Sequence, residues 1–149
     1  MTEPKSEKKI QHEVLLAVNR KYKNRVRLWR NNVGKGFGAW VVMKVMRLLQ
    51  AGNSEQALQE LKQSRPVMFG VNGSPDLQGF IQIYGLAVYL GIEIKDHKGR
   101  QSDLQKNFEK MVNQFGGIYI LARTVEGALE KLEHELQEIN NRVGSHGFR

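Results

Sequence analysis

The 149-residue sequence contains no cysteine. This absence excludes disulfide bonds and metal sites built on thiolates, and it is typical of proteins from a reducing compartment. Long apolar runs are also missing, because no uninterrupted stretch reaches the roughly 18 residues that a membrane-spanning helix needs. The first residues lack the apolar core of a signal peptide. We therefore expect a cytoplasmic protein without a membrane span.

Acidic residues are scarce in the first third of the chain. Residues 1–50 contain 12 Lys and Arg but only 3 Asp and Glu, whereas residues 51–149 contain 11 and 12. The net charge of +8 therefore arises in the first third, where the segment Arg20–Arg30 holds six basic residues. A localised basic patch is typical of proteins that bind a polyanion such as nucleic acid. The alternative is a solvated face that only keeps the protein soluble.

Hydrophobic periodicity predicts an α/β fold, with a mixed central sheet flanked by helices. The length and the 40% apolar content fit a single domain over residues 1–149, with flexible tails at 1–6 and 141–149. In chain order we expect a helix at 7–22, a strand at 26–33, a glycine-rich loop at 34–38, helices at 39–50 and 54–63, strands at 77–83 and 88–95, a loop at 96–101, a helix at 104–115, a strand at 117–123 and a helix from 125.

Three charged residues stand at the ends of two neighbouring strands. Asp76 precedes the strand at 77–83, and Glu93 and Lys95 project from the same face of the next strand. If the two strands pair, Asp76 lies close to Glu93 and Lys95. Two carboxylates beside an amine suit a hard divalent cation that places water against a phosphodiester. The alternative is a turn cap at Asp76 and an exposed ion pair of ~0–1 kcal/mol between Glu93 and Lys95.

This arrangement resembles a known nuclease signature. Pro75-Asp76, followed after sixteen residues by Glu93-Ile94-Lys95, is similar to the PD-(D/E)xK motif. Further matches are Glu13 in the first helix, Arg30-Asn31-Asn32, Ser102-Asp103-Leu104-Gln105, Gly116-Gly117-Ile118-Tyr119 and the closing helix. The series resembles the virus-type replication–repair nuclease (VRR-NUC) family over most of residues 8–138. The chain departs from the family pattern at 39–65, where a helical pair looks like an insertion.

The resemblance implies a restriction-endonuclease-like core that hydrolyses DNA phosphodiesters with Mg²⁺ or Mn²⁺. The metal would be held by Asp76, Glu93, the backbone carbonyl of Ile94 and, directly or through water, Glu13. Lys95 would lie near the attacking water, and Gln105 would complete the catalytic set.

Two of these residues, Glu13 and Gln105, also fit a purely structural role. Glu13 stands at the edge of an apolar helical stripe, where an acid reaches solvent, and Gln105 forms a capping box with Ser102.

The same resemblance directs attention to residues that would contact DNA. Arg30 and Asn31 occupy the Arg-Asn position of the family, although a solvated strand end accounts for them equally well. Basic residues before this position and directly after Glu93-Ile94-Lys95 are placed to contact the phosphate backbone. The expected DNA-binding residues are Arg25, Arg27, Arg30, Asn31, Lys98 and Arg100. The histidines have no ligand spacing, so surface or packing roles are expected for His12, His97, His134 and His146.

Stand-alone members of the family imply a homodimer that acts on branched DNA such as four-way (Holliday) junctions. Their setting is DNA repair in phages or mobile elements, hence in a bacterium or a phage-infected cell. The alternatives are a nuclease for flaps or nicks, and a non-catalytic, basic DNA-binding protein on a nuclease-like fold. The insertion carries more apolar residues than two solvated helices need, which predicts a dimer interface unless both faces pack within the monomer. These residues are Trp40, Val41, Val42, Val45, Met46, Leu48, Leu49, Leu58 and Leu61.

Overall fold

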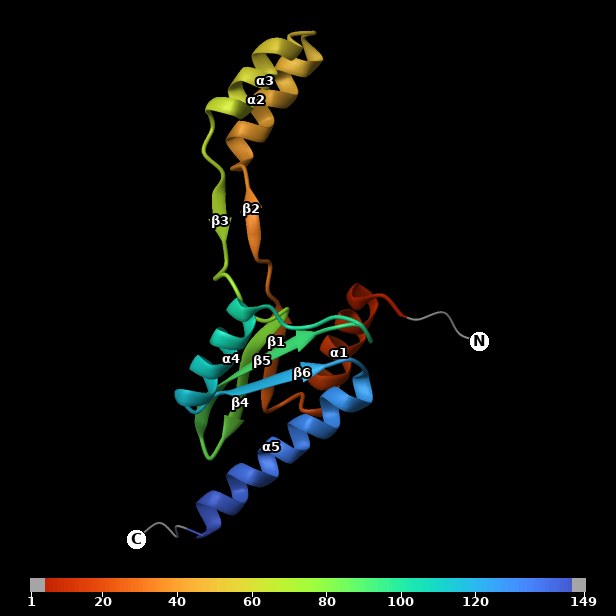
Figure 1. The fold of residues 1–149 in the computed structure, drawn as a ribbon, viewed down its shortest axis with the longest axis vertical. Coiled ribbons are helices and arrows are strands. Elements are labelled where there is room, and N and C mark those ends of the chain that lie inside the picture. The colour runs from red at the N-terminus through yellow and green to blue at the C-terminus, as the bar shows by residue number, and fades with distance from the viewer. Residues whose placement is uncertain (1–4, 146–149) are drawn as a thin grey trace. The chain divides into compact units, whose positions relative to one another are not determined.

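The computed structural model describes residues 5–145, and the chain forms two compact units (Figure 1). The inserted unit is Asn32–Asn72, which contains the insertion predicted at 39–65, and the core unit is the remainder of the chain. The core unit contains α1 (Glu7–Lys21), β1 (Val26–Arg30), β4 (Leu77–Ile83), β5 (Leu86–Ile94), α4 (Asp103–Gln114), β6 (Ile118–Ala122) and α5 (Val125–Ser145). The inserted unit contains β2 (Gly34–Gly36), α2 (Ala39–Gln50), α3 (Ser54–Gln63) and β3 (Val67–Phe69).

The core unit is built on one four-stranded mixed sheet, which confirms the predicted α/β architecture. Its strand order is β1-β4-β5-β6, with β1–β4 and β4–β5 antiparallel and β5–β6 parallel. The turn between β4 and β5 consists of Tyr84 and Gly85, both at positive φ. Two such residues are the signature of a tight hairpin turn, which fixes the register of the strands. Leu77 thereby lies opposite Ile92.

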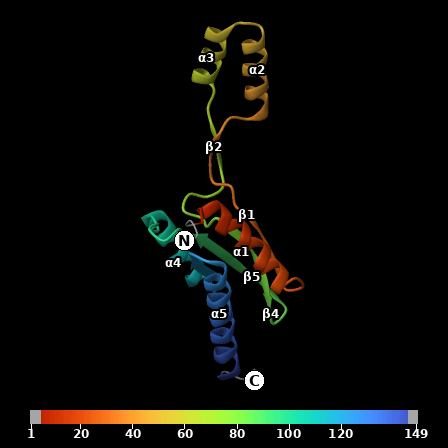
Figure 2. The same ribbon diagram turned by 90° about the vertical axis from the view of Figure 1, so that its right-hand side faces the viewer.

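The hydrophobic core lies on one face of this sheet, beneath α1 and α5. Alternate residues of the four strands point to this face and are buried against apolar stripes of the two helices. Helix α4 covers part of the opposite face, and Figure 2 shows α1 and α4 on opposite sides of the sheet. The helical residues in the core are Ile10, Val14 and Val18 of α1 and Ala128 and Leu132 of α5.

The closest approach within the sheet occurs at Gly79 of β4. A Cβ atom built at this position would lie 1.9 Å from the carbonyl oxygen of Arg27 on β1. A side chain there would have to separate the two strands, so glycine is required for the observed pairing. Gly79 thereby fixes how β1 and its basic residues sit beside β4.

Two of the predicted boundaries are wrong. The tail predicted from residue 141 is helical as far as Ser145, because Val143 is half-buried and continues the apolar stripe of Leu136 and Ile139. The strand predicted at 26–33 ends at Arg30, where the chain leaves the sheet for the inserted unit. The rest of the predicted tails, residues 1–4 and 146–149, lies outside the described residues.

The inserted unit joins a helical pair to a short two-stranded ribbon. The glycine segment predicted as a loop forms β2, which pairs antiparallel with β3 about thirty residues later, with Gly34 opposite Phe69. Helix α2 carries a half-buried stripe of Val41, Val45 and Leu48, and its neighbour α3 buries Ala57. The other large apolar residues of α2 are exposed: Trp40, Val42, Met43, Met46 and Leu49. Within residues 5–145, no helix has the length and apolar character needed to cross a membrane.

Candidate active site

The hairpin of β4 and β5 brings the two predicted carboxylates together. Asp76 immediately precedes β4, and the register that pairs Leu77 with Ile92 places Asp76 across from Glu93. The carboxylate of Asp76 accepts a hydrogen bond of 2.9 Å from the backbone N–H of Ile94. The proximity predicted from strand alternation is therefore present, and a backbone hydrogen bond orients the Asp76 side chain.

Glu93 is the most deeply buried charged residue in the described part of the chain, with 1% of its surface exposed. Its Oε1 atom lies 2.5 Å from the ammonium of Lys95, whose side chain is 14% exposed. The same Oε1 accepts a hydrogen bond from the side-chain amide of Gln105. The other oxygen, Oε2, is buried without a hydrogen-bond partner. A buried carboxylate oxygen without a partner is costly, and it marks a position that a cation or a water would stabilise.

The pKa shifts of Asp76 and Glu93 also indicate a position that a cation would stabilise. Burial raises the pKa of Asp76, and the Ile94 hydrogen bond and the charge of Lys95 offset this only in part. Burial also raises the pKa of Glu93; the hydrogen bond from Lys95 lowers it, and the neighbouring charge of Asp76 raises it further. A nearby divalent cation would reverse both shifts, because it stabilises the ionised carboxylates.

Lys95 remains protonated in this environment. Burial lowers its pKa, but the hydrogen bond to Glu93 and the charges of Glu93 and Asp76 outweigh that effect, so the pKa is raised overall. Lys95 is therefore an ammonium cation at neutral pH. It is suited to stabilising negative charge or orienting a water molecule, and it is a poor general base in this state.

Gln105 has both roles that the sequence left open. Its side-chain oxygen accepts from the backbone N–H of Ser102 at 2.9 Å, while the Ser102 hydroxyl accepts from the Gln105 N–H, which completes a capping box at the start of α4. Its side-chain amide donates to Glu93 at the same time. The cap therefore fixes the Gln105 side chain in the orientation that holds Glu93.

Tight packing against α4 positions the segment that carries Asp76. Gly73 has a φ of +83°, and a Cβ built there would lie 2.4 Å from the carbonyl oxygen of Leu104. Only glycine combines this backbone conformation with so close an approach. The first turn of α4 therefore lies directly against the Gly73–Asp76 segment, which brings Gln105 and Asp76 to the same site.

Asn31 clamps this segment from the other side. Its side-chain amide donates to the Ser74 hydroxyl at 2.7 Å and to the Pro75 carbonyl at 2.9 Å, and its backbone N–H donates to the Asp76 carbonyl at 2.8 Å. Its side-chain oxygen accepts from Gln78 at 3.2 Å. Both amide hydrogens are thus used within the protein. Asn31 has none left for the predicted phosphate contact and acts instead as a positioning residue for Asp76.

Helix α1 approaches the site through residues other than Glu13. Gln11 donates to the Asp76 carbonyl at 3.3 Å, and Glu7 accepts from the backbone N–H of Asp96 at 3.1 Å. Glu13 instead forms an ion pair with Lys5, at 2.7 Å. Residues two apart on a helix point in different directions, so Glu13 cannot share the side of the helix that Gln11 presents to Asp76. The structure does not bring Glu13 to the site, contrary to the predicted ligand set.

The backbone carbonyl of Ile94 faces the same edge as Asp76. The N–H of Ile94 donates to Asp76, whereas the N–H of Lys95 donates to Ala122 of β6 on the other side. In an extended strand the N–H and C=O of one residue point to the same side. The predicted contribution of this carbonyl therefore agrees with the strand geometry.

These groups fit a magnesium-type ion. Asp76, Oε2 of Glu93 and the Ile94 carbonyl offer oxygen ligands, and Mg²⁺ is commonly held by one or two carboxylates while it keeps several waters. Across residues 5–145, no group of three or more His, Asp or Glu side chains gathers closely enough to hold a metal. A bound ion would therefore depend on two carboxylates, one carbonyl and water.

The predicted DNA-binding residues separate into two groups. Arg25 and Arg27 are exposed at β1, where Arg25 also donates to the Gln82 carbonyl at 3.3 Å. Arg30 is exposed and contacts His12 of α1, at 3.4 Å, on the face of β1 opposite that of Arg27. The second group, Lys98 and Arg100, is exposed in the loop that follows β5. His97 and His134 are also exposed, and His146 lies outside the described residues.

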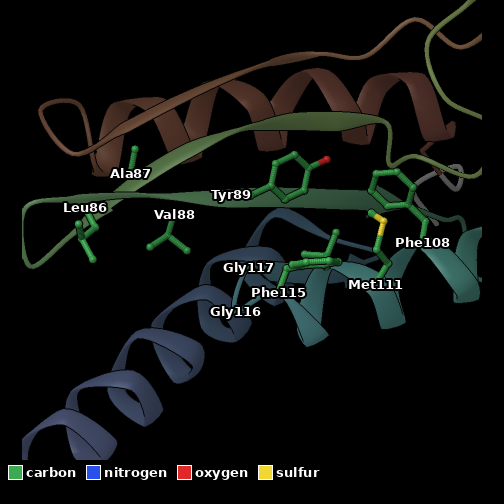
Figure 3. A pocket seen from close by; sticks show the side chains of 10 residues that line it. Leu86, Ala87, Val88, Tyr89, Phe108, Met111, Phe115, Gly116 and Gly117 are labelled. Atoms are coloured by element: carbon green, nitrogen blue, oxygen red, sulfur yellow. The ribbon is translucent and has the colours of Figure 1, made fainter.

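An apolar cavity lies away from this charged cluster. It has a volume of about 600 Å³ and lies between the first half of β5 and α4, at the end of β5 opposite Glu93 (Figure 3). Tyr89, Phe108, Met111 and Phe115 contribute to its lining, which contains no charged side chain. This cavity is therefore apolar, whereas the cluster at Asp76, Glu93 and Lys95 is charged.

Comparisons with known proteins add no support to the candidate site, which therefore rests on its geometry. No family model, curated protein or solved structure matches the chain. Sequence reasoning also missed Glu7, Gln11 and the positioning role of Asn31. An i, i+4 pair of polar residues on one helix face could have indicated Glu7 and Gln11, but no sequence signal shows which face of α1 meets Asp76.

Proposed function

We propose that this protein is a metal-dependent endonuclease of the PD-(D/E)xK type that hydrolyses DNA phosphodiester bonds. The observation that carries the proposal is the buried Oε2 of Glu93, which has no hydrogen-bond partner. Glu93 itself lies across from Asp76 and forms an ion pair with Lys95 through Oε1. A purely structural ion pair would not need a second carboxylate or leave a buried oxygen unsatisfied.

Asp76, Glu93 and the Ile94 carbonyl would hold Mg²⁺ or Mn²⁺. When bound, the ion would polarise the phosphoryl oxygen and lower the pKa of a coordinated water. Glu13 is not part of this set, because its carboxylate pairs with Lys5. Gln105 keeps Glu93 in place through its hydrogen bond to Oε1, and this bond leaves Oε2 available.

Lys95 supplies the fixed positive charge of the reaction. Hydrolysis forms a bond from a water oxygen to phosphorus and breaks one phosphorus–oxygen ester bond, while negative charge accumulates on the phosphoryl oxygens. An ammonium held against Glu93 and shielded from solvent stabilises that charge more strongly than it would in water. The proton released by the water leaves to solvent or to the departing oxygen, because Lys95 is already protonated.

A nucleic-acid backbone is the substrate class that the charge distribution favours, and the family resemblance makes DNA the proposed member of that class. Arg25, directly before β1, and Arg27, on β1, are exposed, and Lys98 and Arg100 are exposed in the loop after Glu93-Ile94-Lys95. Cations on both sides of the carboxylate pair suit a phosphate backbone that passes over the site.

We further propose that the protein is a homodimer that cuts branched DNA such as a four-way junction. Two symmetric cuts require two active sites at a fixed spacing, which an isologous interface supplies. The exposed apolar side of α2, formed by Trp40, Val42, Met43, Met46 and Leu49, is the surface proposed for that interface.

Cleavage assays on a panel of substrates test this function. Labelled single strand, duplex, flap and four-way junction DNA would be incubated with the full-length protein, with Mg²⁺, with Mn²⁺ and with chelator. We expect cleavage that requires metal and is fastest on the junction. Preferred cutting of flaps or nicked duplexes would replace the junction assignment. Binding without cleavage under every metal condition would contradict the nuclease proposal and favour a DNA-binding protein on a nuclease-like fold.

A further inference from the structure

The face of the sheet that carries Glu93 continues as an open surface toward the other end of the strands. Cross-strand partners share a face, and the register places Trp29 beside Gln78, which lies beside Gly91, two residues from Glu93. The next row consists of Arg27, Phe80 and Tyr89. These side chains therefore lie on the same face as the candidate active site.

Helix α4 covers only part of this face. It packs near β6, and its Phe108 ring contacts Tyr89 of β5 at a centroid distance of 6.4 Å. On the β1–β4 half, Trp29 and Phe80 are 41% and 47% exposed. Their ring centroids are 5.9 Å apart and the ring planes are tilted by 54°. Two large aromatic side chains are thus held next to each other on rigid strands, with their surfaces available to a ligand.

Three cations lie near the Phe80 ring, on the side of the pair that is farther from Asp76 along β4. A hollow of about 420 Å³ is lined by Lys23, Arg25 and Arg27 together with Phe80 and Gln82. No carboxylate in residues 5–145 forms an ion pair with these three cations, whereas Lys21 pairs with Glu133 and Lys44 with Glu60. Positive charge without an acidic partner, beside an exposed aromatic ring, is complementary to a nucleotide with its phosphate.

The spacing links this surface to the cleavage site. Phe80 follows Asp76 by four residues of β4, which corresponds to about 13 Å along a strand. A polynucleotide strand whose phosphate is bound at Asp76 and Glu93 can therefore extend over Trp29 and Phe80 toward Arg25 and Arg27. A duplex offers few free base faces for such rings, because its bases are already stacked on one another, whereas unpaired bases stack readily on aromatic side chains.

We propose that Trp29, Phe80, Lys23, Arg25 and Arg27 form a platform that binds unpaired nucleotides of the substrate strand. The two rings stack on the bases and the three cations bind the phosphates. This inference rests on the proposed nuclease function and narrows its substrate class: the DNA contains a single-stranded segment beside the bond that is cut. Nothing in the platform reads the sugar, so DNA and RNA strands share the required chemistry and the test must separate them.

Tryptophan fluorescence gives a direct test, because the sequence contains only two tryptophans. Full-length Asp76→Asn protein carrying Trp40→Phe retains Trp29 as its only tryptophan and is not expected to cleave. Addition of oligo(dT) without metal should quench its emission, since a stacked base contacts the ring. The matched control carries Trp29→Phe and keeps Trp40, which is 69% exposed in the inserted unit, and its emission should not change.

Binding affinities provide the second measurement. Replacing Trp29 and Phe80 by leucine keeps the surface apolar but removes the stacking rings. We expect affinity for oligo(dT) to fall about 5- to 150-fold per lost stacked base, with duplex affinity changed less than about threefold. Circular dichroism would confirm that the variants fold. Parallel titrations with oligo(U) separate DNA from RNA. RNA is the ligand if the wild type binds oligo(U) more tightly than oligo(dT) and if the leucine variants lose more affinity for oligo(U) than for oligo(dT).

Several results would overturn the platform. Equal quenching by duplex and single strand would assign the face to duplex DNA, and absence of quenching would remove base stacking. Dissociation of a dimer on Trp29→Leu substitution would assign the face to a second copy of the chain. The nuclease proposal is tested separately: quenching without any cleavage by the wild type would preserve the platform and remove the nuclease.

Discussion

The core unit and the inserted unit use apolar residues in opposite ways. In the described chain every buried hydrophobic side chain except Ala57 belongs to the core unit. Helix α2 of the inserted unit has a more apolar sequence, AWVVMKVMRLLQ, than the helices of the core unit, yet none of its residues is buried. The core unit, in contrast, buries a charged residue, Glu93, at its candidate site. Apolar sequence alone therefore does not determine burial, because burial also requires a facing surface.

The difference also separates two kinds of expected function. In the core unit, hydrogen bonds from Gln105 and Ile94 hold carboxylates in fixed positions at the end of a packed sheet. Rigid support of this kind is what a catalytic group needs. Among the described residues, the buried polar and charged side chains, Ser74 and Glu93, both belong to the core unit, whereas the inserted unit exposes apolar side chains on α2. Such a surface is suited to recognition rather than to chemistry.

The largest effect is expected from loss of a carboxylate in the core unit. Asp76→Asn should reduce cleavage by about 10³-fold or more, because metal-based charge stabilisation supplies several kcal/mol. DNA binding should remain within a few-fold. The matched change in the inserted unit, Glu60→Gln, removes the partner of Lys44 and should leave cleavage intact. Cleavage and gel-shift assays on the same preparations test both variants, and full activity of Asp76→Asn would refute the metal site.

A leucine pair tests the contrast in burial. Leu90 is fully buried in the core unit, and Leu49 of α2 is 54% exposed. Leu90→Ala should lower the free energy of unfolding by about 2–5 kcal/mol, because it leaves a cavity. Leu49→Ala should change it by no more than about 0.5 kcal/mol. Urea denaturation of both variants gives the comparison, and similar losses would show that Leu49 is buried in solution against a partner.

The salt dependence of DNA binding tests which unit carries the phosphate contacts. Replacing Arg25 and Arg27 by glutamine should reduce the slope of log K against log salt by roughly one to two units, because fewer counterions are released. The same change at Lys35 and Arg65, two cations of the inserted unit, should leave the slope unchanged. Fluorescence anisotropy at several salt concentrations measures the slopes, and the opposite outcome would move the DNA surface to the inserted unit.

The buried carboxylates predict a pH effect with a defined sign. Burial raises the pKa of Asp76 in the folded state, so the folded protein binds more protons than the unfolded chain above the ordinary carboxylate pKa. Ionised Asp76 therefore destabilises the metal-free fold, and this cost increases as the pH rises through the raised pKa. We expect Asp76→Asn to gain stability relative to wild type between about pH 4 and 7. Added Mg²⁺ should stabilise the wild type alone.

Thermal unfolding across this pH range, with chelator and with Mg²⁺, provides the measurement. Glu60→Gln is the control, because its ion pair with Lys44 lies in the inserted unit. A stability difference that does not depend on pH would show that Asp76 ionises as it does in the unfolded chain.

Substitutions at the exposed apolar residues of α2 are expected to have the smallest effect on the stability of the monomer. Met43→Glu with Met46→Glu changes two exposed residues, so the stability of the isolated chain should change by less than about 0.5 kcal/mol per substitution. A dimer that uses this surface should dissociate. Val41 is unsuitable for this test because it belongs to the half-buried stripe of α2. Light scattering distinguishes the cases, and a monomeric wild type at micromolar concentration would remove the dimer.

The local features of the candidate site follow from the amino-acid sequence. Strand alternation placed Glu93 and Lys95 on one face, and the pairing of two consecutive strands brought Asp76 to them. The capping box of Ser102 and Gln105 was visible because its members are three residues apart. These features depend on strand and helix geometry and on interactions between near neighbours, which the chain specifies wherever it folds.

Contacts between residues that are distant in the sequence depend on how the helices and strands pack. The pairing of Gly34–Gly36 with Val67–Phe69 joins segments that carry no mutual sequence signal. Gln11, and not Glu13, reaches Asp76 because packing against the sheet sets the rotation of α1 about its axis. Asn31 contacts Ser74, which lies 43 residues later in the sequence, and Gly73 packs against Leu104 of α4; both contacts join segments that are distant in the chain. Sequence periodicity gives the direction of a side chain within its element, but the distances between elements arise only when the elements pack.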